Sequence, residues 1–256
     1  MPRDITLLAV DTHAPLLLRR SIERTLDCID CSRVITLTSE PVYPHAEWIQ
    51  IRSITVADYN QLMIKHLWPM ITTEHVLVIQ YDGMAVNGDQ WSDDFLNYDY
   101  IGAWWPWAHH PDQYRVGNGG FSLRSRRLID RLRDNVIVCD HNEDQCIGIV
   151  YRDYLESHGI RYADKHTAQR FSHEHPAAHH NSFGFHGCFN VPYYLDDAAV
   201  EEFIKHLPGR STEAALRMVC ALITLGRHDL AQQAIALGSE QDPQYVSKLE
   251  QVARLT

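Results

Sequence analysis

Apolar runs and helical patterns alternate along the first part of the chain. Residues 5–10 are an apolar run that ends at Asp11, residues 16–26 carry leucine and isoleucine at helical spacing after Pro15, and residues 34–38 form a second short apolar run. A strand, a helix and a strand in this order are typical of a βαβ unit, in which a helix joins two parallel strands. The first forty residues therefore predict the beginning of a parallel sheet.

The pattern continues with a strand that is buried on both faces. Residues 76–79 are four consecutive apolar residues, three of them β-branched, as in the central strand of a parallel sheet. Further strands are predicted at residues 48–51, 100–103, 121–123 and 160–163, and further helices at residues 59–67, 126–133 and 143–158. The predicted fold class is α/β, with a mixed, mainly parallel sheet flanked by helices.

Beyond residue 198 the pattern is helical, with helices predicted at residues 201–206, 213–225 and 230–237. We therefore expect a main domain over residues 1–195 and a small C-terminal helical appendage over residues 196–256. The appendage is expected to serve acceptor binding, oligomerisation or docking onto another polypeptide.

Polar residues follow the buried strand directly. Gln80 and Asp82 flank Tyr81, and Gly83 lets the chain turn away. Open α/β sheets bind their ligands at the carboxyl ends of their strands, and an acid placed there can hold a divalent metal ion. An Asp-Gly turn that only ends the strand explains the same residues equally well.

Composition narrows the function classes. The chain has 256 residues and a net charge of −10, which argues against a nucleic-acid partner. It has no signal peptide pattern and no run of eighteen apolar residues, so we expect a cytoplasmic protein without a membrane span. Among six cysteines only Cys28 and Cys31 are close in sequence, and two separate core thiols explain them better than zinc or redox chemistry.

Three polar groups occur in loops that follow predicted elements: Gln80 with Asp82, Glu143 with Asp144, and His186. Carboxylate and amide oxygens together with an imidazole suit a divalent ion such as Mn²⁺ or Mg²⁺. A metal ion held in this way would bridge a diphosphate.

At these residues the chain resembles the metal-dependent glycosyltransferases of the GT-A fold, over roughly residues 5–190. In that family a helix with a Tyr/Asn-rich start leads into a strand that ends in Asp-x-Asp. The chain resembles in particular a GT-A-like group with Gln-x-Asp in place of Asp-x-Asp. The matching stretches are Asp58-Tyr59-Asn60-Gln61-Leu62, Ile79-Gln80-Tyr81-Asp82, Asp99-Tyr100-Ile101-Gly102-Ala103 and the glycine-rich run from Gly117 to Ser125.

The resemblance implies a role for each matching position. Asp82 and His186 would bind the metal ion, with less help from Gln80, which carries no charge. Asp144 would be the base that takes the proton of the acceptor hydroxyl, and Glu143 would contact a substrate. The positions expected to bind the nucleotide sugar are Asp11, Thr12, Asn60, Lys65, Gln80, Tyr81, Asp82, Asn118, Gly119 and Gly120.

Trp104, Trp105 and Trp107 form a dense aromatic loop. Their rings suit the faces of the acceptor sugar, but they could equally pack under a loop as a satellite core. Glu143 and Asp144 also favour the beginning of a helix through its dipole, without any catalytic role.

The function that the resemblance implies is transfer of a sugar from a nucleotide-diphosphate sugar to a saccharide hydroxyl, with inversion, in bacterial surface polysaccharide or glycan synthesis. Its partners would be that donor and a saccharide acceptor. Two alternatives remain. One is a non-catalytic carbohydrate- or nucleotide-binding module on a degenerate transferase fold, and the other is a metal-dependent nucleotide-sugar hydrolase or nucleotidyltransferase.

Overall fold

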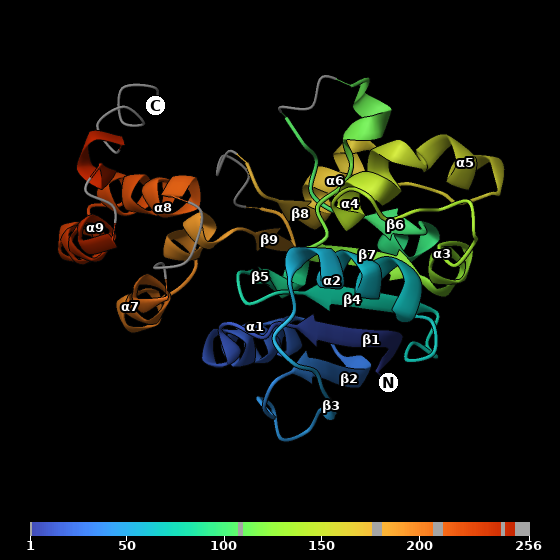
Figure 1. The fold of residues 1–256 in the computed structure, drawn as a ribbon, viewed down its shortest axis with the longest axis horizontal. Coiled ribbons are helices and arrows are strands. Elements are labelled where there is room, and N and C mark those ends of the chain that lie inside the picture. The colour runs from blue at the N-terminus through green and yellow to red at the C-terminus, as the bar shows by residue number, and fades with distance from the viewer. Residues whose placement is uncertain (1, 107–109, 176–180, 207–211, 242–243, 249–256) are drawn as a thin grey trace. The chain divides into compact units, whose positions relative to one another are not determined.

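The structure is a computed structural model that describes residues 2–106, 110–175, 181–206, 212–241 and 244–248 (Figure 1). The chain divides into two compact units, Met1–His186 and Gly187–Thr256. The domain division expected from the sequence, into residues 1–195 and 196–256, stays a prediction.

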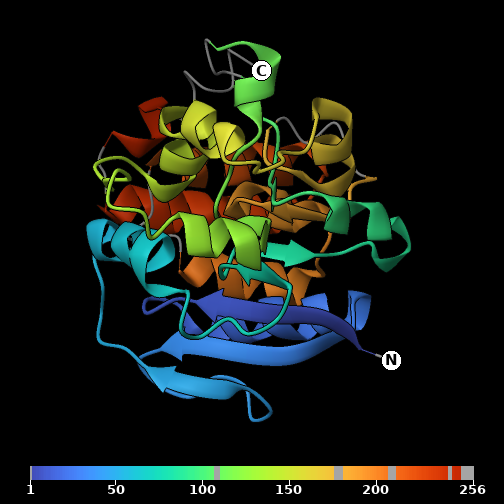
Figure 2. The same ribbon diagram turned by 90° about the vertical axis from the view of Figure 1, so that its right-hand side faces the viewer.

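A six-stranded sheet forms the centre of the first unit, in the strand order β3-β2-β1-β4-β7-β6. β1 is parallel to β2 and β4, and β2 is parallel to β3, as the neighbouring strands in Figure 2 illustrate. β7 is antiparallel to both β4 and β6. The strands are β1 (Arg3–Val10), β2 (Cys31–Thr38), β3 (Glu47–Gln50), β4 (His75–Ile79), β6 (Tyr100–Ile101) and β7 (Phe121–Ser125). The predicted α/β class with a mixed, mainly parallel sheet is therefore confirmed.

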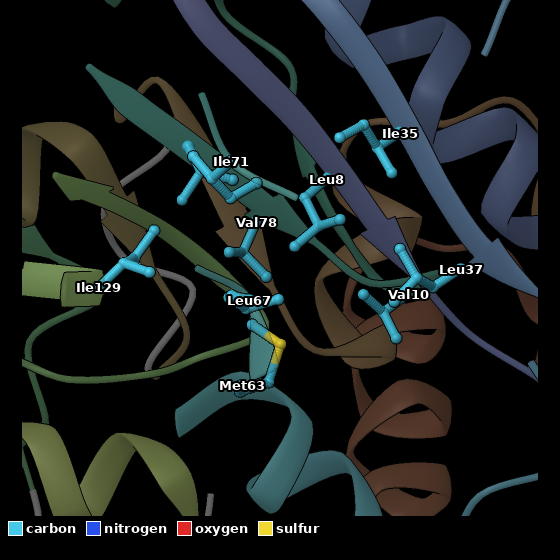
Figure 3. Packing of buried hydrophobic residues seen from close by; sticks show 10 residues of the cluster. Leu8, Val10, Ile35, Leu37, Met63, Leu67, Ile71, Val78 and Ile129 are labelled. Atoms are coloured by element: carbon cyan, nitrogen blue, oxygen red, sulfur yellow. The ribbon is translucent and has the colours of Figure 1, made fainter. Parts of the chain in front are cut away.

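One face of the sheet is covered by an apolar core (Figure 3). Successive strand residues point to opposite faces, so alternate residues of β1, β2 and β4 share this face. Met63 and Leu67 pack on this face of the sheet. Ile129, from a later part of the chain, packs on the same face. The cluster consists of Leu8, Val10, Ile35, Leu37, Met63, Leu67, Ile71, Val76, Val78 and Ile129.

Helix α1 (Pro15–Cys28) fixes the chain that leaves β4. The hydroxyl of Ser21 donates a hydrogen bond of 2.6 Å to the carbonyl oxygen of Tyr81. The hydroxyl of Thr25 accepts one of 3.1 Å from the backbone N–H of Ala85. Both hydroxyls are buried, so these bonds hold the segment after β4 in one position on the helix.

A second, three-stranded sheet has the order β5-β9-β8. Its strands are β5 (Gly83–Ala85), β8 (Ser172–His173) and β9 (Gly184–His186). β5 and β9 are antiparallel, with Gly83 opposite His186. This pairing brings a residue from the end of the first unit beside the end of β4.

Two predicted helices have different boundaries. The helix predicted at residues 59–67 begins earlier, because Thr55 is the cap and forms a capping box with Asp58. It is built from α2 (Val56–Gln61) and a π-helical segment, η1 (Leu62–His66). The helix predicted at residues 143–158 is divided into α4 (Glu143–Gln145), the π-helical segment η5 (Cys146–Val150) and α5 (Arg152–Ser157).

The strand predicted at residues 160–163 is only a single bridge between Tyr100 and Tyr162. The remaining helices of the first unit are η2 (Gly88–Gln90), η3 (Asp93–Asn97), η4 (Asp112–Arg115), α3 (Arg126–Arg131) and α6 (Lys165–Phe171). Ser125 caps α3, since its hydroxyl accepts from the backbone N–H of Leu128 at 3.0 Å.

The second unit is helical, as predicted. Its helices are η6 (Cys188–Tyr193), α7 (Asp197–Lys205), α8 (Thr212–Thr224) and α9 (His228–Gln241). Arg227 joins them, because its guanidinium donates to the carbonyl oxygens of Pro192 and Leu195 and pairs with Asp197. Among the described residues, none of the helices combines the length and the apolar character that crossing a membrane requires.

Asp99 ties together the strands β6 and β7 and the segment that follows α5. Its buried carboxylate accepts hydrogen bonds from the Ser125 hydroxyl at 2.5 Å, the Arg161 backbone N–H at 2.7 Å and the Arg127 guanidinium. Burial by itself raises the pKa of Asp99, but these hydrogen bonds outweigh it and hold the pKa below its ordinary value.

We expect Asp99→Asn to lower the free energy of unfolding by about 2–4 kcal/mol at neutral pH, because the amide leaves buried donors without a charged acceptor. Urea denaturation measures the loss. Since the folded-state pKa lies below the unfolded value, the advantage of the wild type is complete above a pH of about 4 and shrinks as the pH falls through the lowered pKa.

The matched control is Asp130→Asn, which removes the exposed ion pair with Arg126 on the adjacent helix. This change should cost less than about 1 kcal/mol. Equal losses in the two variants would show that Asp99 is no more important than a surface acid.

Candidate active site

The carboxylate of Asp82, just after β4, has one oxygen that accepts no hydrogen bond from the described residues. The backbone N–H of Gln80 donates to the carbonyl oxygen of Gly120 at 3.0 Å, which fixes the turn. The hydroxyl of Tyr81 donates to Oδ2 of Asp82 at 2.7 Å. Oδ1 of Asp82 is buried and has no hydrogen-bond partner among the residues that the structure describes. An unpartnered buried carboxylate oxygen is costly unless a cation or a donor completes it.

His186 faces this oxygen from β9. Its Nε2 lies 3.6 Å from Oδ1 of Asp82 and 3.2 Å from Oε1 of Gln80. Burial by itself lowers the pKa of His186, but the negative charges of Asp82 and Glu174 outweigh it and raise the pKa to about 9. The imidazole therefore carries a positive charge at neutral pH, at the position where the three side chains converge.

Glu174 lies next to the second ring nitrogen of His186 and was not among the predicted site residues. Its Oε1 lies 3.3 Å from Nδ1 of His186, on the side of the ring away from Asp82. Burial by itself raises the pKa of Glu174, but the hydrogen bond and charge of His186 outweigh it and lower the pKa. Histidines that bind metal ions commonly have a carboxylate on the second ring nitrogen. No local pattern marks Glu174, which follows a strand of only two residues.

The donor set fits a divalent cation of the kind predicted. Asp82 and Gln80 offer oxygen atoms and His186 offers Nε2 at the same place, a combination that suits Mn²⁺ or Mg²⁺. The orphaned Oδ1 of Asp82 is the observation that supports this fit. A metal ion at this place would displace the proton of the imidazole.

Side chains of Glu143 and His186 occupy the space next to the glycines of the glycine-rich turn. A Cβ atom on Gly119 would lie 1.4 Å from Oε1 of Glu143, and one on Gly120 would lie 2.1 Å from Nε2 of His186. Between Gly117 and Gly119, Asn118 adopts a φ of 71°, and its Oδ1 accepts from the N–H of Gly120 at 3.1 Å. The absence of side chains at these glycines thus makes room for the site residues, and their contact with a donor sugar stays a prediction.

Glu143 forms a buried ion pair with Arg124. Nη2 of Arg124 lies 2.9 Å from Oε2 of Glu143, and the two side chains are 0% and 4% exposed. Burial raises the pKa of Glu143, and the charge of Arg124 opposes that rise. Oδ1 of Asn60 accepts from the backbone N–H of Glu143 at 3.1 Å, so Asn60 braces the beginning of α4. The expected substrate contacts of Glu143 and Asn60 stay predictions.

Asp144 is half-buried beside the glycine turn. Its Oδ2 accepts from the backbone N–H of Gly119 at 3.4 Å, and its Oδ1 accepts from that of Gln145 at 2.8 Å. Burial raises the pKa of Asp144, and the two backbone hydrogen bonds oppose that rise. A carboxylate with a raised pKa is a stronger proton acceptor, as a general base requires.

Three other residues predicted to contact the nucleotide form hydrogen bonds within the protein. Oδ1 of Asp11 accepts from the backbone N–H groups of His13 and Ala14 in the turn before α1. The hydroxyl of Thr12 lies 3.0 Å from Nδ1 of His13. Nζ of Lys65 donates to carbonyl oxygens after α3, at 2.8 and 2.9 Å. Nucleotide contacts of these three residues stay predictions.

The tryptophan loop is partly core. Trp105 is 5% exposed, and its ring occupies the place of a side chain at Gly117. Trp104 is half-buried, with Arg115 and Lys165 each 4.0 Å from its ring centre. Trp107 lies outside the described residues. Their expected role in acceptor binding stays a prediction.

The chain is similar to several solved structures. The bifunctional IspDF from Campylobacter jejuni is 11% identical with a TM-score of 0.42, and the match covers 62% of this chain but only 48% of that protein, about half its length. The mannosyltransferase PcManGT from Pyrobaculum calidifontis, in complex with GDP-Man and Mn²⁺, is 9% identical with a TM-score of 0.46, covering 100% of this chain and 76% of that one.

A glycosyltransferase involved in the glycosylation of the major capsid of PBCV-1 is 14% identical with a TM-score of 0.44, covering 72% of this chain and 92% of that one. No curated protein matches the sequence.

One family of proteins matches the sequence itself, over residues 47–186. The matched stretch begins at β3 and ends at His186, so it contains the end of β4, the glycine turn and the acidic pair. Because it is more than half of the chain, the protein belongs to the family described as "Protein of unknown function (DUF5672)".

Proposed function

We propose that the protein is a metal-dependent glycosyltransferase, which moves a sugar from a nucleotide-diphosphate sugar to a saccharide hydroxyl with inversion. The observation that carries the proposal is the buried Oδ1 of Asp82, which accepts no hydrogen bond from the described residues and faces His186 and Gln80 at the end of a central strand. Ligands of α/β sheets bind at such strand ends. The sequence resemblance to GT-A enzymes at the same residues supports the reaction class.

Asp82 and His186 would hold the metal ion, with Gln80 as a neutral third ligand. When bound, Mn²⁺ or Mg²⁺ would stabilise the negative charge that develops on the departing diphosphate. Glu174 would orient the imidazole through Nδ1. Because Gln80 contributes no charge, we expect weaker metal binding than at a site with two carboxylates.

Asp144 would act as the base. Its carboxylate takes the proton of the acceptor hydroxyl while that oxygen forms a bond to C1 of the sugar and the bond from C1 to the diphosphate breaks. Attack from the face opposite the diphosphate inverts the configuration at C1. Glu143, paired with Arg124, would position the neighbouring Asp144. The residues expected to contact the nucleotide would bind the donor, and the tryptophan loop would bind the acceptor. The protein would act in the cytoplasm, in bacterial surface polysaccharide or glycan synthesis.

A non-catalytic binding module is the second candidate, and the charge of His186 favours it. With a pKa of about 9, the imidazolium itself supplies a cation between Asp82 and Glu174. Such a site would be complete without a metal ion. Binding of a nucleotide sugar without turnover by the wild-type protein would support this candidate.

Asp82→Asn should abolish metal-dependent nucleotide binding. With a nucleoside diphosphate present, Mn²⁺ at about 100 times its Kd should raise the Tm of the wild type by about 5–10 °C. The variant should show little of this rise, because the charged ligand is lost. The control is Asp89→Asn, which changes an exposed acid soon after β5 and should respond as the wild type does. An unchanged Mn²⁺ response in Asp82→Asn would place the metal elsewhere.

Asp144→Asn should lower kcat for sugar transfer by about 10²–10⁴-fold, because the amide cannot accept the proton of the acceptor. The Kd of the nucleotide sugar, measured by calorimetry with Mn²⁺, should stay the same. Gln145→Ala, at the exposed neighbouring position, is the control and should retain transfer. Normal transfer by Asp144→Asn would rule out its role as the base.

A further inference from the structure

Two thiols, one in the loop before α4 and one directly after that helix, lie close together. Sγ of Cys139 lies 3.8 Å from the carbonyl oxygen of His141, and Sγ of Cys146 lies 3.7 Å from the same oxygen. The two thiols also share a hydrogen bond. Cys139 precedes the acidic pair of Glu143 and Asp144 and Cys146 follows it, so the thiols meet at the base of the loop that carries both acids.

Imidazole and carboxylate donors lie beside these thiols. Ligand atoms of Asp140, His141 and Cys146 are all within 4.8 Å of one another. Oδ1 of Asp140 lies 2.7 Å from Nδ1 of His141, and both of these side chains are exposed while Cys146 is buried. The group is therefore anchored at one end and open to solvent at the other.

We propose that Cys139, His141 and Cys146, with Asp140 as the fourth ligand, bind one Zn²⁺ ion. Sulfur and imidazole donors favour zinc over Mn²⁺ and Mg²⁺, which prefer oxygen. Ligand atoms around a tetrahedral zinc ion lie roughly 3.3–3.8 Å apart, so the atoms of Asp140, His141 and Cys146 need to move by about 1 Å. Cys139, whose thiol is hydrogen-bonded to that of Cys146, completes the set.

A redox role for the same pair is disfavoured. Burial raises the pKa of the Cys139 thiol to about 12, and it also raises the pKa of the Cys146 thiol. Reactive cysteines instead have lowered pKa values, because the thiolate is the nucleophile. A metal ion can displace the thiol protons, so neutral thiols are compatible with a zinc site.

The zinc ion would cross-link the two ends of the segment from Cys139 to Cys146. The segment between the two thiols carries Glu143, which is buried, and Asp144, the proposed base. Cross-linking the two ends of a loop limits its freedom. This site is separate from that of Asp82, and its ligands are of a different chemical class.

Cobalt substitution tests the proposal. Metal-free, fully reduced protein titrated with Co²⁺ should develop a thiolate-to-cobalt charge-transfer band that saturates at one equivalent and disappears when Zn²⁺ is added. Cys146→Ser should lose most of the band. Cys28→Ser removes a thiol of the C-x-x-C pair, away from the cluster, and should keep it. Absence of the band, or its loss in Cys28→Ser, would overturn the proposal.

A second variant guards against misfolding, because Cys146 is buried and His141 is exposed. His141→Ala should fold with the Tm of the metal-free wild type but bind Zn²⁺ at least about 100-fold more weakly in competition with a chromophoric chelator. Zinc should raise the Tm of the wild type by more than that of this variant, which keeps the site at Asp82. An equal rise in both would show that zinc binds elsewhere. These readouts do not depend on sugar transfer, so they stand or fall independently of the proposed function.

Discussion

The buried ion pair of Arg124 and Glu143 is the interaction on which the arrangement of the site depends. Removing two charges from water costs several kcal/mol for each ion, and only close geometry with additional hydrogen bonds offsets that cost. Nε of Arg124 donates to the Ser122 hydroxyl at 3.0 Å, and the backbone N–H of Glu143 donates to Asn60. The pair thus links β7 and α2 to the beginning of α4. Its loss would leave an uncompensated charge in the core of the first unit.

The ion pair of Arg124 and Glu143 can form only because position 119 is a glycine. The carboxylate of Glu143 occupies the space that a side chain on Gly119 would take, so any larger residue there would displace it. Asp144 directly follows Glu143, and its carboxylate accepts from the N–H of the same glycine. The position of Asp144 is therefore determined by packing and charge beneath it rather than by a flexible loop. Positioning of this kind is what a base needs in order to meet a hydroxyl at hydrogen-bonding distance.

The charges around the turn leave a place for a cation. The carboxylates of Asp82, Glu174 and Asp144 all act on His186, and each raises its pKa. Arg124 is already paired with Glu143. The imidazolium therefore faces three acids, and an ion of higher charge at its Nε2 would compensate them better.

Sequence patterns predicted the sheet because its strands are long enough to show a period. β1, β2 and β4 are five residues or longer and strongly apolar, and the polar residues that follow β4 were predicted to form the site. β5, β8 and β9 are only two or three residues long, too short for any periodicity, yet the pairing of Gly83 with His186 brings the imidazole to Asp82. Glu174 was missed for the same reason.

The sequence also does not reveal which polar side chains form hydrogen bonds within the protein instead of binding a ligand. Lys65 and Asn60 have the residue types expected of ligand contacts, but their side chains bond to backbone groups far along the chain. Six residues separate Cys139 from Cys146 in the sequence, and they form no metal-binding pattern. The two thiols lie close together only in the folded chain, one before α4 and one directly after it. Because the oxygen-rich group at Asp82 and the sulfur-rich group at Cys146 differ in softness, each would select its own metal ion from a mixture. One ion would then serve the departing diphosphate, and the other would hold the loop that presents the base.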